Sequence, residues 1–219
     1  MSRNVCSAFI ASMLLLAGAG VRAATDLSVA IITAPLSGCA LGPSEKVTVR
    51  LFNHGDALPA GTRFDVSYVI VGGEPVTESV TLATTLLPTS ALAHTFAVPA
   101  DLSIAGTFHF DASASIANDS NPMNNGLSGH MVLNSAPSLG GTVTGPDSAF
   151  SGTLMLAGHL GGVRQWEQST DDAERWVGLD NPTATLAFDE LTRTTLFRAE
   201  VKNGSCVPTY SSIWTVNPL

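Results

Sequence analysis

The chain has 219 residues, 45% of them hydrophobic, and it carries 10 Lys and Arg against 18 Asp and Glu. The formal charge of −8 argues against a nucleic-acid partner, which requires a basic face, and against attraction to an anionic membrane surface. No G-x-S-x-G, H-E-x-x-H, C-x-x-C or P-loop pattern occurs, so we predict no enzymatic activity and no cofactor.

The first 23 residues have the pattern of a secretory signal peptide. An apolar run over 5–21 follows Arg3 and gives way to small residues, so we expect cleavage after Ala23, with Ala24 as the alternative position. An uncleaved membrane anchor is the other interpretation of this segment. No later stretch approaches the roughly 20 apolar residues that a spanning helix needs. We therefore expect an exported protein, extracellular, at the cell surface or in the periplasm, with no membrane span after cleavage.

Short apolar-alternating runs separated by Gly, Pro, Asn and Asp dominate the remaining sequence and predict β-strands. In the first of them Leu27, Val29 and Ile31 are expected to share one face. Seven strands are predicted before residue 135, over 26–33, 46–53, 63–71, 76–84, 91–99, 106–117 and 126–134. Six more are predicted after it, over 152–158, 163–169, 175–179, 183–188, 194–202 and 210–216, with "GTVTG" as a further candidate.

A Gly- and Pro-rich segment at 135–145 separates the two sets of strands and predicts a linker. The domains expected are the signal peptide 1–23, a first β-sandwich over 24–134 and a second over 146–219. The fold class predicted is all-β, with two immunoglobulin- or fibronectin-III-like antiparallel sandwiches in tandem.

Three stretches resemble known families of bacterial secreted proteins. "SGTLMLAGHLGGVRQWEQSTDDAERWVGLDNPTATLAFDELTRTTLFRAEVKNGSC" resembles the Ig-like repeats of bacterial surface proteins. "PLSGCALGPSEKVTVRLFNHG" and "NDSNPMNNG" are similar to cell-adhesion-related (CARDB-like) and gliding-protein Ig-like modules. Both resemblances imply β-sandwich modules of surface or secreted proteins, usually without chemistry of their own.

The cysteines depart from the pattern of the repeat family, which commonly has a Cys just before the "SG" of its first strand. Ala149 and Phe150 stand there, so Cys206 lacks the partner that the resemblance implies within its own domain. Cys39 is the other cysteine outside the signal peptide. Export would permit a disulfide between them if their Cα atoms lie within about 7 Å. Two separate buried thiols are the alternative.

Aromatic residues provide the candidate ligand-binding sites. Trp166 is expected in the core of the second sandwich. Trp176 and Trp214 are the candidates for stacking on the apolar face of a sugar ring, and core packing is the alternative for both.

The asparagine-rich stretch at 116–126 is the candidate metal site. Calcium prefers six to eight oxygen ligands, whereas Asn and Asp also form turns by bonding their own backbone. Both interpretations stay open. The weak calcium candidates are Asp111, Asn118, Asp119, Asn121, Asn124 and Asn125.

Together these features predict a secreted, non-enzymatic bacterial protein that serves as a binding, adhesion or structural module. Its partner would be a protein or glycan at a cell surface. The alternatives are a carbohydrate-binding module, a periplasmic accessory protein that pairs with a partner strand, and a hydrolase with a site between the domains.

Overall fold

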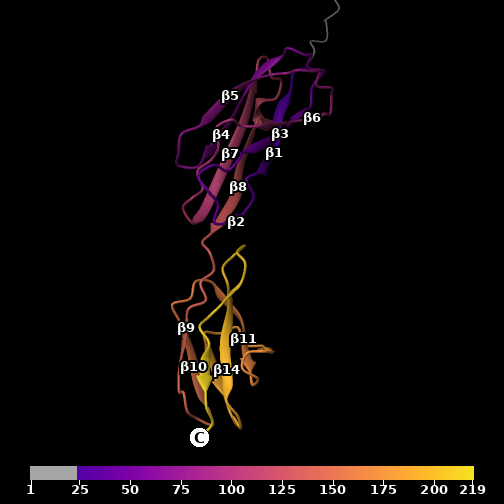
Figure 1. Cartoon of the computed structure of the whole chain (residues 1–219). Helices are drawn as coiled ribbons and strands as arrows, with labels where there is room; N and C mark the ends of the chain where they lie inside the picture. The colour runs from indigo at the N-terminus through magenta and orange to yellow at the C-terminus, as the bar shows by residue number, and fades with distance from the viewer. Residues whose placement is uncertain (1–23) are drawn as a thin grey trace, which may run out of the picture.

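The computed structural model describes residues 24–219 and consists of two β-sandwiches joined end to end (Figure 1). The predicted signal peptide, 1–23, lies outside the described residues. Each sandwich has a hydrophobic core of its own. The predicted fold class, all-β with tandem antiparallel sandwiches, is confirmed by this arrangement of sheets. Among the described residues, no helix is long and apolar enough to cross a membrane.

The first sandwich packs a three-stranded sheet against a five-stranded one. The smaller sheet has the order β1-β3-β6, with bounds Leu27–Ala34, Thr48–Asn53 and Ala91–Thr95. The larger sheet has the order β2-β8-β7-β4-β5, with bounds Gly38–Cys39, Gly126–Ser135, Gly106–Ile116, Arg63–Ile70 and Val76–Thr81. A single 3-10 turn, η1 (Pro122–Asn124), lies between β7 and β8. All seven predicted strands are present, and the additional two-residue β2 pairs in parallel with the end of β8.

Alternation of apolar and polar residues places the core of the first sandwich as expected, with one exception. Val47, Val49 and Leu51 are fully buried. The expectation that Ile31 shares their interior is wrong, because its side chain is 47% exposed while Ile32 is 1% exposed. The register of β1 on β3 shifts between Val29 and Ile31, and this additional residue puts Ile32 in place of Ile31 on the buried side of the sheet. A second shift follows between Ile32 and Ala34.

The second sandwich repeats the layout with a three-stranded sheet, β9-β10-β13, and a five-stranded one built around β11 and β14. The smaller sheet has the bounds Thr142–Thr144, Gly152–Ala157 and Thr185–Phe188. The larger sheet contains β12, β11, β14, β15 and β16, with bounds Val177–Leu179, Gly162–Ser169, Thr195–Lys202, Thr209–Tyr210 and Trp214–Val216. The candidate strand "GTVTG" therefore does pair, as β9 on β10.

The predicted last strand, 210–216, is divided into β15 and β16 by a polar interruption. Ser211 donates its backbone N–H to the carbonyl of Ala199, and its hydroxyl accepts the Ala199 N–H at 2.8 Å. The hydroxyl thus takes a place in the ladder that a backbone carbonyl normally occupies. As a result β15 pairs with one end of β14 and β16 with the other.

Candidate functional site: aromatic stack, asparagine loop and domain junction

Trp166 lies in the core of the second sandwich, as its position in β11 predicts. Its side chain has 0% exposure, and its indole N–H donates to the carbonyl of Thr183 at 2.9 Å. Trp214 also packs against this core, and its indole N–H donates to the carbonyl of Pro146 at 3.0 Å. The structure therefore gives Trp214 a packing role between β16 and the start of the domain.

Trp176 is the candidate tryptophan that stays at the surface, where it forms part of a stack on the outer face of the five-stranded sheet. The guanidinium carbon of Arg198 lies 3.9 Å from the centroid of the Trp176 ring and 3.8 Å from that of Tyr210. Tyr210 is 44% exposed. A cation over an aromatic face is attracted by the ring quadrupole, so Arg198 joins the two aromatic side chains across β14.

Glu167 holds Arg198 in this position. The Nε of Arg198 donates to Glu167 Oε2 at 2.7 Å, and Gln165 donates to the other carboxylate oxygen at 3.1 Å. Glu167 is 8% exposed, which is rare for a carboxylate that has no partner. We define Glu167, Trp176, Arg198 and Tyr210 as the aromatic stack. Arg198 and Tyr210 were not singled out from sequence, although Arg198 points outward from β14 between the buried residues Phe197 and Ala199.

The asparagine-rich segment lies at the pole of the first sandwich farthest from the domain junction. Asp119 makes an Asx turn, its Oδ1 accepting the Asn121 N–H at 2.9 Å, and its Oδ2 lies 3.5 Å from the Leu27 nitrogen. Asn118 adopts a left-handed φ of 58°, which Asn tolerates well in turns. These contacts account for the segment as a connection between β7 and β8.

The structure brings Asn124 close to the start of β1 but does not bring Asp111 into the loop. Asn124 donates its side-chain amide to Asp26 Oδ1 at 2.8 Å, and the amide oxygens of Asn124 and Asn125 are buried without a hydrogen-bond partner. Asp111 lies within β7, where its Oδ1 accepts the Gly129 N–H at 2.9 Å. Within residues 24–219, no three His, Cys, Asp or Glu side chains gather closely enough to hold a metal ion.

One Ser–His contact has the elements of a nucleophile and base. The Ser28 hydroxyl lies 2.9 Å from Nε2 of His54, but Ser28 is only 5% exposed and the His54 ring stacks at 4.6 Å on Phe52. A nucleophile must be open to its substrate and its base must be oriented by a third group. The contact fits a structural hydrogen bond between β1 and the turn after β3.

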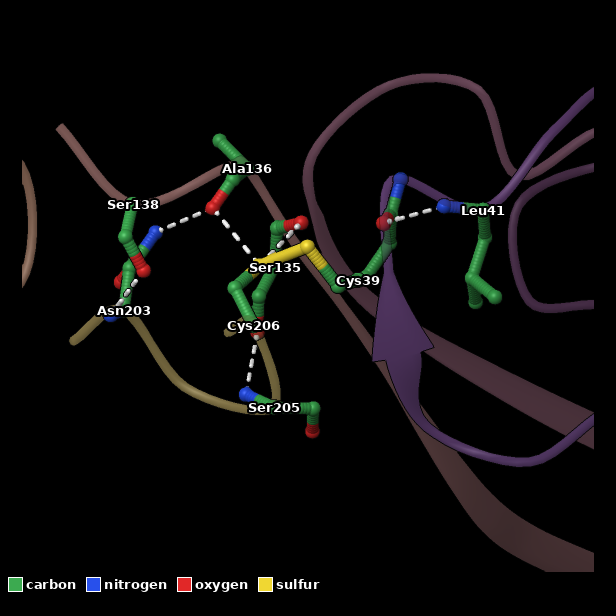
Figure 2. The surroundings of a disulfide bond; sticks show 9 residues. Cys39, Leu41, Ser135, Ala136, Ser138, Asn203, Ser205 and Cys206 are labelled. Carbon is green, nitrogen blue, oxygen red and sulfur yellow. Dashed lines mark hydrogen bonds between the residues drawn. A yellow bond between two sulfur atoms is a disulfide. The ribbon is translucent and has the colours of Figure 1, made fainter. Parts of the chain in front are cut away.

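The junction between the two sandwiches contains a disulfide (Figure 2). Cys39 in β2 is bonded to Cys206 in the loop after β14, with a Cα–Cα distance of 4.8 Å across a sequence separation of 167 residues. The two separate thiols that sequence left as an alternative are not what the structure contains. The bond links a short edge strand of the first sandwich to a loop of the second.

Hydrogen bonds reinforce the disulfide on the same loop. Asn203 donates its backbone N–H to the Ser138 hydroxyl at 2.9 Å and its side-chain amide to the Ala136 carbonyl at 2.8 Å (Figure 2). Gly204 passes so close to Ser135 that a Cβ at this position would collide with its hydroxyl. The predicted linker is therefore held along its first residues by the β14–β15 loop, which we define, with the disulfide, as the junction clasp.

Comparisons with known proteins do not identify a function. Residues 138–218 match a family described as a domain of unknown function, DUF8696. No curated protein sequence matches the chain.

Among solved structures, a CARDB domain from Pyrococcus furiosus is similar, with 19% identity over 51% of this chain and 96% of that chain and a TM-score of 0.35. A set of titin domains has 13% identity over 89% of this chain and 66% of that chain, with a TM-score of 0.46. Fibronectin(III)-like modules from Clostridium thermocellum have 11% identity over 86% of this chain and 92% of that chain, with a TM-score of 0.35. At these identities the likeness concerns the fold alone.

Proposed function

We propose that the protein is exported and acts, without catalysis, as a binding or structural module at the cell surface or in the periplasm. The observation that carries this proposal is the junction clasp. Disulfides form and persist in oxidising compartments and are rare in the reducing cytosol. The Cys39–Cys206 bond joins two separately folded units, so it fixes how they are presented to a partner.

The charge of the processed chain supports the same location. Removing 1–23 takes away Arg3 and Arg22 and leaves 8 Lys and Arg against 18 Asp and Glu, a formal charge of −10. A net charge far from zero keeps a protein soluble and disfavours self-association. A protein or glycan partner at a surface fits this balance better than a polyanion does.

The surface that we propose for binding is the aromatic stack. Aromatic and arginine side chains are enriched at the centres of protein interfaces, and a flat indole ring also stacks on sugars. Arg198 covers one face of the Trp176 ring, so a sugar would use the opposite face. A protein partner could use Tyr210 and Trp176 together.

The test is binding of the purified two-domain protein to a glycan array and to intact cells of the producing organism. Trp176→Ala is expected to lower binding by tenfold or more. The matched control is Val177→Ala, which removes a more exposed apolar side chain, 53% exposed, from the adjacent position. Equal binding by both variants would remove the stack from the proposal, and a wild-type protein that binds neither the array nor the cells would leave only the structural role.

A further inference from the structure

Residues 24–26 are hydrogen-bonded to the turn that follows β3. The N–H groups of His54 and Gly55 donate to the Asp26 carbonyl at 2.9 and 3.3 Å, and the Asp56 N–H donates to the Ala24 carbonyl at 2.8 Å. Gly55 has no side chain, and a Cβ at this position would collide with the Ala24 carbonyl oxygen. Residues 24–26 therefore belong to the folded first sandwich.

Asp56 forms hydrogen bonds with both the backbone N–H and the backbone carbonyl of Ala24. Besides its N–H bond to the Ala24 carbonyl, its carboxylate Oδ2 accepts the backbone N–H of Ala24 at 2.8 Å. A cavity of about 270 Å³, lined in part by Ala24, Asp56 and Arg63, adjoins this contact. There is thus room beside the Ala24 nitrogen for a group larger than an amide N–H.

We propose that Ala24 is the first residue of the mature protein and that its α-ammonium group forms an ion pair with Asp56. The inference rests on the export proposed above. A leader peptidase of the exporting cell would hydrolyse the Ala23–Ala24 peptide bond with one water molecule. The C–N bond breaks, the water oxygen bonds to the Ala23 carbonyl carbon, and the Ala24 nitrogen gains the proton that makes it an amine.

Cleavage at this bond and cleavage at the next one would have different consequences for the folded protein. An ammonium group protonated at neutral pH replaces a single neutral N–H donor, and charge-assisted hydrogen bonds are roughly twice as strong as neutral ones. Cleavage after Ala24 would instead remove the residue whose nitrogen and carbonyl both bond Asp56. Processing at Ala23 thus strengthens a contact that processing at Ala24 would delete.

The first experiment is intact-mass measurement and amino-terminal sequencing of the full chain after expression in a bacterium that exports it. We expect a mature protein that begins at Ala24. A protein that is exported but begins at Thr25 or elsewhere overturns this inference and leaves the proposed function standing. A full-length protein retained in the cytosol overturns both.

The second experiment tests the ion pair by a double-mutant cycle. Asp56→Asn is compared in the mature chain and in a form with a short Gly-Ser extension before Ala24, where the Ala24 nitrogen is an amide. We expect Asp56→Asn to lower Tm about 2–4 °C further in the mature chain, the range for a surface ion pair in a domain of this size. Glu74→Gln, at an exposed carboxylate in the β4–β5 turn, serves as the control and should shift both forms equally. Equal shifts for Asp56→Asn in both forms would overturn the anchoring role.

Discussion

The ion pair between Glu167 and Arg198 within the aromatic stack offers a quantitative test of the second sandwich. In Arg198→Met the Nε donor and the guanidinium over both rings are lost, and Glu167, which is 8% exposed in the wild-type structure, loses its cation. Removing one partner of a buried pair typically costs about 3–5 kcal/mol, mainly because the other charge is left uncompensated. The pair is only partly shielded from water, with the Arg198 side chain 20% exposed, so we expect the lower end, about 3 kcal/mol.

The charge contribution is separated from the packing contribution by a double-mutant cycle with Glu167→Gln. Because Glu167→Gln removes the uncompensated charge, the double variant should be about 2 kcal/mol more stable than the sum of the single effects predicts. Arg164 and Glu200 form the control pair on the same sheet, at 4.0 Å and with Arg164 53% exposed. An exposed pair of this kind should couple by at most about 0.5 kcal/mol.

The assay is urea unfolding followed by tryptophan fluorescence. All three tryptophans, Trp166, Trp176 and Trp214, lie in the second sandwich, so this signal reports on that domain alone. Two results together would contradict an uncompensated charge on Glu167: a loss of less than about 1 kcal/mol of unfolding free energy in Arg198→Met, and a Glu167–Arg198 coupling energy equal to that of the control pair.

Three further predictions concern other parts of the molecule. Burial raises the pKa of the Tyr68 hydroxyl above its usual 10.0, and the Glu78 carboxylate adds to the effect. Tyr68 therefore contributes stability that is fully present below pH 10.0 and is lost as pH rises through the raised pKa. The Tm should fall less steeply with rising alkaline pH in Tyr68→Phe than in the wild type, and an equal slope would contradict this. Ala173 has a φ of 69° at the tip of the β11–β12 connection, a left-handed conformation that strains a residue with a side chain. Ala173→Gly should therefore stabilise the second sandwich by about 1 kcal/mol in urea unfolding. A lower urea midpoint in the variant would count against backbone strain at this position. Cys206→Ser removes the covalent bond of the junction clasp, so proteolytic cleavage within the segment between β8 and β9 should increase several-fold while both cores stay folded. Equal cleavage of the oxidised wild type and the variant would contradict this.

Strand positions could be predicted from sequence because one face of each strand is buried and the other is not. In β7, Phe110, Ala112 and Ala114 are buried while His109 and Ser113 are exposed, and the strand is predicted from sequence at 106–117. Ile31 was assigned to the wrong side because a bulge has no signature in apolar spacing, which looks the same with or without an additional residue.

The sites were harder to predict, because they depend on contacts between residues far apart in the chain. Nothing in the spacing of Cys39 and Cys206 indicates that two domain ends meet, and a bridge needs that proximity. Sequence spacing does not link Glu167 to Arg198, 31 residues later, whereas the register of β11 on β14 places the two residues opposite each other. A cross-strand pair of this kind becomes visible only when the register is known.

We propose that the two sandwiches are held together by a disulfide that forms after export. The most direct measurement is mass spectrometry of peptides from the exported protein, digested without reduction after free thiols have been blocked. We predict one cross-linked species that joins the peptide containing Cys39 to the peptide containing Cys206, and its disappearance on reduction. Recovery of both cysteines in the blocked, unlinked form would contradict the claim.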